Sequence, residues 1–121
     1  MEAEHQVQLD LVRALRAALE KGQDRSSTTA LLRQLLDYSD AHFLSEHLLM
    51  RLHAYPAYED HVQEHDRLVE QLRGTAASWE RGEGEAAGNL LQQVEEWLLV
   101  HMTTTDKALE GYLAEHGPRP A

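Results

Sequence analysis

Three short breaks divide the chain into four long segments that each carry the apolar pattern of an amphipathic helix. The breaks contain Gly22, Pro56 and Gly82, residue types that end helices or turn the chain. The breaks lie at residues 22–27, 54–56 and 81–85. The predicted helices run over residues 2–21, 27–54 and 57–81, and from 85 towards 117. Four such segments with short connections constrain the chain to very few folds.

The composition agrees with a wholly helical chain. There are 20 Leu and 15 Ala, against 6 Val, 1 Phe and no Ile, so good helix formers dominate and good strand formers are scarce. We therefore predict an all-α fold, an up-down-up-down antiparallel four-helix bundle with a short C-terminal helix. The 121 residues suit one domain. We expect the bundle domain to occupy residues 1–116 and a tail to occupy 117–121.

Charge and composition exclude several classes of function. The formal net charge of −10 disfavours nucleic acid and anionic membrane as partners. The absence of cysteine excludes disulfides, iron–sulfur clusters and thiol catalysis. No apolar run is long enough for a membrane span, and the N-terminus lacks the pattern of an export signal, so we expect a cytoplasmic location. The acidic runs 83–85 and 95–96 are expected to face solvent.

Histidines and carboxylates recur at helical spacing. His42 and Glu46 are four residues apart, as are His61 and His65, so the members of each pair share one face of a helix. His101 and Asp106 are five apart, and an ideal helix would separate them by about 140°. The β-branched run 103–105 between those two residues weakens the helix. We expect a bend there that turns the last carboxylate back, followed by a short helix ending near residue 113.

These groups are predicted to lie at one level of the bundle. Residues that are level across a helical hairpin are equidistant from its turn. The midpoint of His42 and His65 is 53.5, that of His5 and His42 is 23.5, and that of His65 and His101 is 83. All three midpoints fall on the predicted breaks or at their edge. Five imidazoles and two carboxylates should therefore meet in one layer of the interior.

Such a layer is costly to bury without a cation. An unpaired carboxylate or imidazole in the interior costs several kcal/mol, whereas both groups are natural ligands of divalent and trivalent metals. The set exceeds what one tetrahedral zinc needs and suits two ions bridged by carboxylates. A single histidine on an apolar face is usually an ordinary core residue, so the joint pattern carries this prediction. The predicted ligands are His5, His42, Glu46, His61, His65, His101 and Asp106, whereas His47, His53 and His116 are expected at the surface.

The sequence resembles the hemerythrins at this point. The residues that carry the resemblance are His42-Phe43-Leu44-Ser45-Glu46, then His61-Val62-Gln63-Glu64-His65, then Trp97-Leu98-Leu99-Val100-His101 with Asp106, after a lone His5. They match the family patterns H-F-x-x-E, H-x-x-x-H and W-L-x-x-H-x-x-x-x-D. The likeness covers residues 2 to about 113, and the bacterial members fit the helix lengths best.

The resemblance implies a cofactor of two Fe ions, Fe2+ or Fe3+, with an oxo or hydroxo bridge, and O2 as the partner. It implies that His61, His65 and His101 hold one iron. The other iron would be held by His5 and His42 and would keep an open position for O2. Glu46 and Asp106 would bridge the two. The implied function is reversible O2 binding for carriage, storage or buffering, in a binding protein more than in an enzyme.

The resemblance also implies an apolar O2 pocket. The residues that match its lining are Phe43, Trp97, Leu98 and Met102. Gln8 stands where the family usually has an apolar residue, which places a polar group near the pocket. His47 replaces an acid that often follows Glu46, at a position expected to lie off the metal face. His5 stands at the very start of the chain, on a helix end expected to fray, or the chain is a piece of a longer protein.

Three alternatives remain open on the sequence. The same domain could sense O2, redox state or nitric oxide for a protein partner whose nature is unknown. Gln8 favours a di-iron peroxidase or oxidase. A metal-free bundle used for binding is the fourth possibility.

Overall fold

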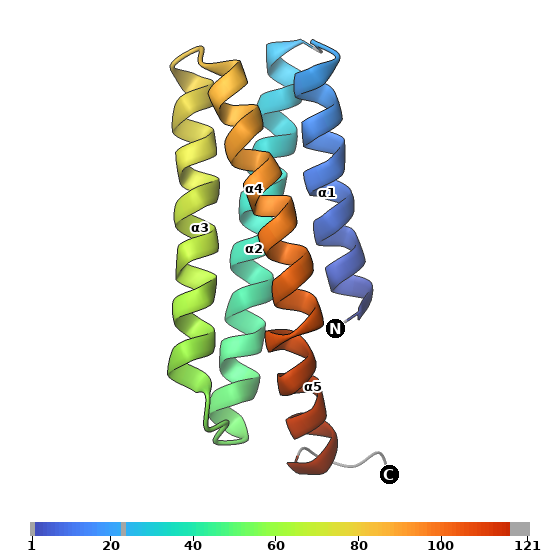
Figure 1. Ribbon diagram of the computed structural model, residues 1–121, viewed down its shortest axis with the longest axis vertical. Helices are drawn as coiled ribbons and strands as arrows, with labels where there is room; N and C mark the ends of the chain where they lie inside the picture. The colour runs from blue at the N-terminus through green and yellow to red at the C-terminus, as the bar shows by residue number, and fades with distance from the viewer. Residues whose placement is uncertain (1, 23, 117–121) are drawn as a thin grey trace.

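The computed structural model describes residues 2–22 and 24–116, which form a four-helix bundle whose last helix is bent (Figure 1). The helices are α1 (Glu2–Glu20), α2 (Arg25–Leu52), α3 (Tyr58–Glu80), α4 (Gly84–Thr103) and α5 (Thr105–His116). The described ranges contain no strand. The predicted all-α bundle is confirmed, whereas the tail predicted for 117–121 lies outside the described residues.

The turns between the helices lie where glycine and proline residues predicted them. Gly22 and Gly82 follow α1 and α3 with φ angles of 62° and 80°, a left-handed conformation that glycine adopts without steric cost. At the corner between α2 and α3, Ala54 adopts a φ of 50°. The hydroxyl of Tyr112 in α5 donates a hydrogen bond to the His53 carbonyl at 2.7 Å, so α5 is tied to this corner.

The predicted bend in the last helix is confirmed at Thr104. This residue has φ −119° and ψ −75°, far from the typical helical values, and separates α4 from α5. The Thr104 hydroxyl donates to the carbonyl of Val100 at 2.7 Å, an alternative bond that competes with regular helix. After the bend, α5 continues to His116, beyond the end expected near residue 113.

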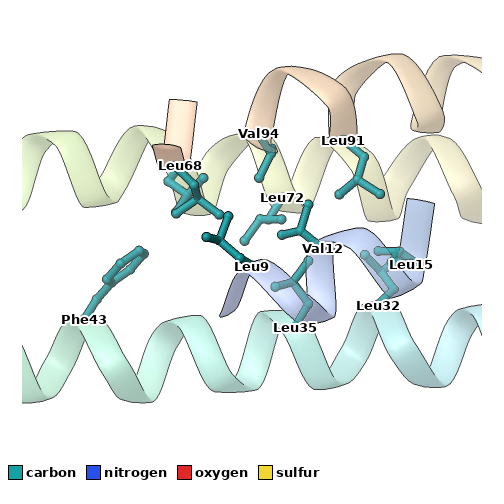
Figure 2. Close-up of a cluster of buried hydrophobic side chains, with 11 residues drawn as sticks. Leu9, Val12, Leu15, Leu32, Leu35, Phe43, Leu68, Leu72, Leu91 and Val94 are labelled. Carbon is teal, nitrogen blue, oxygen red and sulfur yellow. The ribbon is translucent and has the colours of Figure 1, made fainter. Parts of the chain in front are cut away.

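The main apolar cluster lies in the half of the bundle nearer the α1–α2 and α3–α4 turns. Figure 2 shows leucine and valine side chains from all four long helices pointing into one interior cluster, with Phe43 standing apart at one end. The buried cluster consists of Leu9, Val12, Leu15, Leu32, Leu35, Phe43, Leu68, Leu72, Leu91, Val94 and Leu98. In the described ranges, no helix has the length and apolarity needed to cross a bilayer.

One expectation about the surface is wrong. Glu95 was expected to face solvent, but it is only 9% exposed. Its carboxylate pairs with the guanidinium groups of Arg13 and Arg16 on α1. A buried carboxylate is tolerated when a cation compensates it, and here two arginines from the neighbouring helix do so.

Candidate metal centre

The structure brings all seven predicted ligand side chains into one buried layer, and none of them is more than 8% exposed. Every helix contributes to the layer. The contributors are His5 from α1, His42 and Glu46 from α2, His61 and His65 from α3, His101 from α4 and Asp106 from α5. Figure 1 shows the start of α1 beside the α4–α5 junction, which is where the layer closes.

The imidazoles fall into two groups that direct their Nε2 atoms inward. His61, His65 and His101 form what we call the three-histidine side, where the Nε2 atoms of His65 and His101 are 3.1 Å apart. His5 and His42 form the two-histidine side. Their rings meet edge to face with centroids 5.6 Å apart.

Glu46 divides its two oxygens between these sides. Its Oε1 atom is 3.2 Å from the Nε2 of His61 and 3.3 Å from that of His65. Its Oε2 atom is 2.8 Å from the Nε2 of His42. One carboxylate therefore faces both groups of imidazoles at once.

Asp106 does the same from α5. Its Oδ1 atom is 3.0 Å from the Nε2 of His61 and 3.1 Å from that of His101. Its Oδ2 atom is 2.9 Å from the Nε2 of His5. The bend at Thr104 makes this possible, because it turns Asp106 back towards the layer.

The ligand atoms of the layer are arranged better for binding cations than for hydrogen bonding to one another. Glu46, His61, His65, His101 and Asp106 each offer a ligand atom within 4.8 Å of all the others, as do His5, His42 and Glu46 in a second group. Both oxygens of Glu46 and the Nε2 atoms of His42 and His61 are buried without a hydrogen-bond partner in the described residues, although charged groups lie close. Buried polar atoms normally have partners. Two cations would satisfy these donors together.

The pKa values of the buried carboxylates and imidazoles in the layer are shifted in different directions. Burial alone would raise the pKa of Glu46, but the adjoining imidazoles of His42, His61 and His65 outweigh it and hold that pKa far below its usual value. Burial works against a charge on His61, but the Asp106 and Glu46 carboxylates raise its pKa to about 9. Burial lowers the pKa of His65 to about 4. The layer thus keeps anionic carboxylates ready for a positive charge.

Sequence reasoning missed Glu64. Its Oε2 atom accepts a hydrogen bond from the Nδ1 of His101 at 2.7 Å. Such an outer contact fixes the ring of a metal-binding histidine and raises its basicity. The midpoint rule could have found it, because the midpoint of Glu64 and His101 also falls on the Gly82 turn.

The surface assignment of His47 is wrong. The ring is half-buried, and its Nε2 lies 2.9 Å from the Nδ1 of His65. One residue further along a helix turns the side chain by about 100°, which here points His47 towards α3 rather than to solvent. Of the other histidines assigned to the surface, His53 is half-buried and His116 is exposed.

The residues expected to line an O2 pocket surround the layer from different sides. The Phe43 ring stacks on His65 with centroids 3.8 Å apart, and the Trp97 ring stacks on His101 at 4.6 Å. Leu98 is buried in the apolar cluster together with Phe43. Their role as a pocket for O2 stays a prediction.

Met102 and Gln8, the other two residues expected near the O2 pocket, lie elsewhere around the layer. Met102 lines a cleft of about 210 Å³ that also reaches His5. Phe43, by contrast, lines a groove of about 470 Å³ between α2 and α3. Gln8 is buried, and its amide nitrogen donates a hydrogen bond to the Ser39 hydroxyl at 2.9 Å.

Comparisons with known proteins point to one family. The sequence model of the hemerythrin HHE cation binding domain matches residues 1–113. A myohemerythrin of Sipunculus nudus is 30% identical over 87 residues, which cover 72% of this chain and 67% of that protein. A bacteriohemerythrin of Ralstonia nicotianae is 25% identical over 81 residues, which cover 67% of this chain and 59% of that protein. No solved structure gives a significant match.

Proposed function

The chain belongs to the hemerythrin family, and from this membership we propose that it is a non-haem di-iron protein that binds O2 reversibly. The observation that carries the proposal is the orientation of the Glu46 and Asp106 carboxylates, each of which has one oxygen facing the three-histidine side and the other facing the two-histidine side. Such division is what two adjacent ions with bridging carboxylates require. A single ion would leave one set of buried imidazoles without a partner.

The ligand assignment follows from these two sides. His61, His65 and His101 would hold one iron, and His5 and His42 would hold the other. Glu46 and Asp106 would bridge the ions. When bound, the iron pair with its oxo or hydroxo bridge supplies the redox chemistry on which O2 binding depends. The two-histidine side has one imidazole fewer, so it leaves a position that protein does not fill.

The surroundings of the layer favour binding over turnover. Phe43 stacks on His65 and is almost fully buried, as is Leu98, and apolar surroundings of this kind disfavour the escape of charged oxygen species. Gln8 was the reason to consider a peroxidase or oxidase. One of its two amide N–H groups donates to the Ser39 hydroxyl and so ties the side chain to α2, which supports carriage, storage or buffering of O2 as the first proposal. Sensing for a protein partner and a cytoplasmic location stay predictions.

The test is anaerobic reconstitution with Fe2+, followed by admission and removal of O2. We expect two irons per chain by mass spectrometry, and a coloured form that appears with O2 and disappears when O2 is flushed out. His53→Ala is the matched control, because it removes a histidine that none of the layer's contacts involve. A coloured form that cannot be reversed, or a protein that takes up no iron, would refute the proposal. Steady turnover of peroxide with a reductant would favour the enzymatic alternative.

A further inference from the structure

His47 stands outside the seven ligand side chains but touches one of them. Its Nε2 is 2.9 Å from the Nδ1 of His65, and the two rings lie nearly parallel, 20° apart with centroids at 5.1 Å. Tyr58 packs against the other part of the His47 ring, edge to face at 6.3 Å. The imidazole is therefore held between α2 and α3 rather than free in solvent.

The proton positions at this contact follow from the direction of the His65 ring. Its Nε2 points into the layer, 3.3 Å from the Oε1 of Glu46. If that nitrogen offers its lone pair to a cation, the ring proton must be on Nδ1, because a neutral imidazole has one donor and one acceptor. The His65 Nδ1–H then donates to the Nε2 of His47. The His47 ring consequently carries its own proton on Nδ1.

His101 shows the same arrangement with a different acceptor. Its Nδ1 lies 2.7 Å from the Oε2 of Glu64, which is a carboxylate. The acceptor for His65 is a neutral ring. Both outer groups hold a ring at the angle that points its Nε2 inward, but only Glu64 adds a negative charge.

We infer that His47 is a positioning residue for His65, which fixes the tautomer and orientation of that ring through a hydrogen bond from Nδ1. The inference rests on the proposed function, since it takes His65 to be a metal ligand. It concerns a residue that the sequence pattern placed at the surface. Groups that orient metal-binding histidines in this way typically contribute about 10- to 100-fold to metal affinity.

Two substitutions separate the hydrogen bond from the ring stacking. His47→Phe keeps an aromatic ring against His65 and removes the acceptor nitrogen. His47→Gln removes the ring and keeps an acceptor, because its side-chain oxygen can reach the position of Nε2. His53→Phe, at the residue that caps the C-terminus of α2, is the matched control. Each protein is stripped of metal, checked for helicity by circular dichroism and titrated with Co2+ against a chromophoric chelator.

A second measurement reports the hydrogen bond directly. In the Co2+-loaded protein, the ring N–H protons of metal-bound histidines give paramagnetically shifted NMR signals that exchange with solvent. We expect His47→Phe to lose or broaden one of these signals and to weaken Co2+ binding by about 10- to 100-fold. We expect His47→Gln and His53→Phe to keep the signal and to bind within a few-fold of the parent protein.

The outcomes distinguish the inference from the proposed function. If the parent binds Co2+ at both sides but His47→Phe matches it in affinity and in N–H signals, the inference is overturned and the metal centre stands. If His47→Gln loses affinity while His47→Phe keeps it, the ring itself is what matters. If the two variants lose affinity equally, an acceptor at this position is not sufficient. Either result overturns the hydrogen-bond role as well. If the parent binds no metal, both proposals fail together.

Discussion

The three-histidine and two-histidine sides share the same carboxylates, but the chain holds their rings very differently. On the three-histidine side, the Nδ1 atoms of His65 and His101 each have an outer partner, at 2.9 Å and 2.7 Å. Aromatic rings also cover both histidines, through Phe43 and Trp97. His65 and His101 are thus fixed before any cation arrives, which lowers the entropic cost of binding, whereas the Nδ1 of His61 is buried without a hydrogen-bond partner in the described residues.

On the two-histidine side, Tyr38 and Phe43 pack against His42, but no outer polar contact within the described ranges is as short as those of His65 and His101. The polar contact of the His5 ring in the described residues is to Asp106, inside the layer. The Nδ1 of His42 is 3.5 Å from a carboxylate oxygen of Glu4, whose side chain is 47% exposed, so solvent screens this contact. The same types of ligand atom can therefore form one preorganised site and one weak site. The difference comes from the residues that contact the outer side of each histidine ring.

The largest effect should come from the group that both sides share. Glu46→Ala removes both of the oxygens that face His42 and His61, so the buried His42 ring loses its close carboxylate and His61 keeps only that of Asp106. Breaking a buried charge pair in this way typically costs about 3–5 kcal/mol of folding free energy. We expect both ions to be lost, as measured by metal analysis, and lower stability in urea denaturation. The exposed Glu96→Ala on α4 is the control. Retention of two ions by Glu46→Ala would show that Glu46 does not bridge them.

The next prediction tests the asymmetry itself. His5→Ala should lose the ion of the two-histidine side and leave about one iron per chain, because the three-histidine side keeps all its imidazoles. His101→Ala should be more damaging to metal content and to melting temperature, because it also leaves the Glu64 carboxylate and the Trp97 ring without their partner. The two variants are compared by iron analysis and thermal melting. Equal losses in both would mean that the sides are equally held.

The sequence was sufficient to predict the fold and the height of the metal-binding layer along the bundle, because both depend on where the helices end. Turn positions set the heights of His5, His42, His65 and His101, and glycine and proline mark those turns. Heights, however, say nothing about how far each helix is rotated about its own axis.

That rotation decides the details that were missed. It turned His47 towards α3, and it buried Glu95 against two arginines of α1. Glu64 stands at the right height for His101, but only its long side chain brings the carboxylate to the ring. Contacts that depend on a long side chain reaching a neighbouring helix can be identified only from the packed structure.

The metal affinity of the three-histidine side should depend on pH. In the metal-free protein the pKa of His61 is raised to about 9, so at pH 7.5 this ring carries a proton that a cation must displace. Affinity should therefore rise with pH, by about tenfold per unit while one proton is displaced, and level off above pH 9. Calorimetric titration of Co2+ in two buffers of different ionisation enthalpy measures the protons released. No proton release at pH 7.5 would contradict the role of His61.

The smallest effect should follow from loosening α5. The Tyr112 hydroxyl donates to the carbonyls of His53 at 2.7 Å and Ala54 at 3.3 Å, and so ties the helix that carries Asp106 to the α2–α3 corner. Tyr112→Phe removes only that hydroxyl, which is worth about 1 kcal/mol of stability.

Asp106 offers one oxygen to each side, and Glu46 remains available to both when α5 loosens. The three-histidine side also keeps the outer contacts of His65 and His101, so the two-histidine side should weaken more. We therefore expect Tyr112→Phe to retain its first Co2+ with unchanged affinity and to bind the second a few-fold more weakly, as measured by chelator competition. Tyr38→Phe is the matched control, because this tyrosine stacks on His42 through its ring. Weakening of the first ion alone would reverse the order of the two sides and place the firmer site around His5.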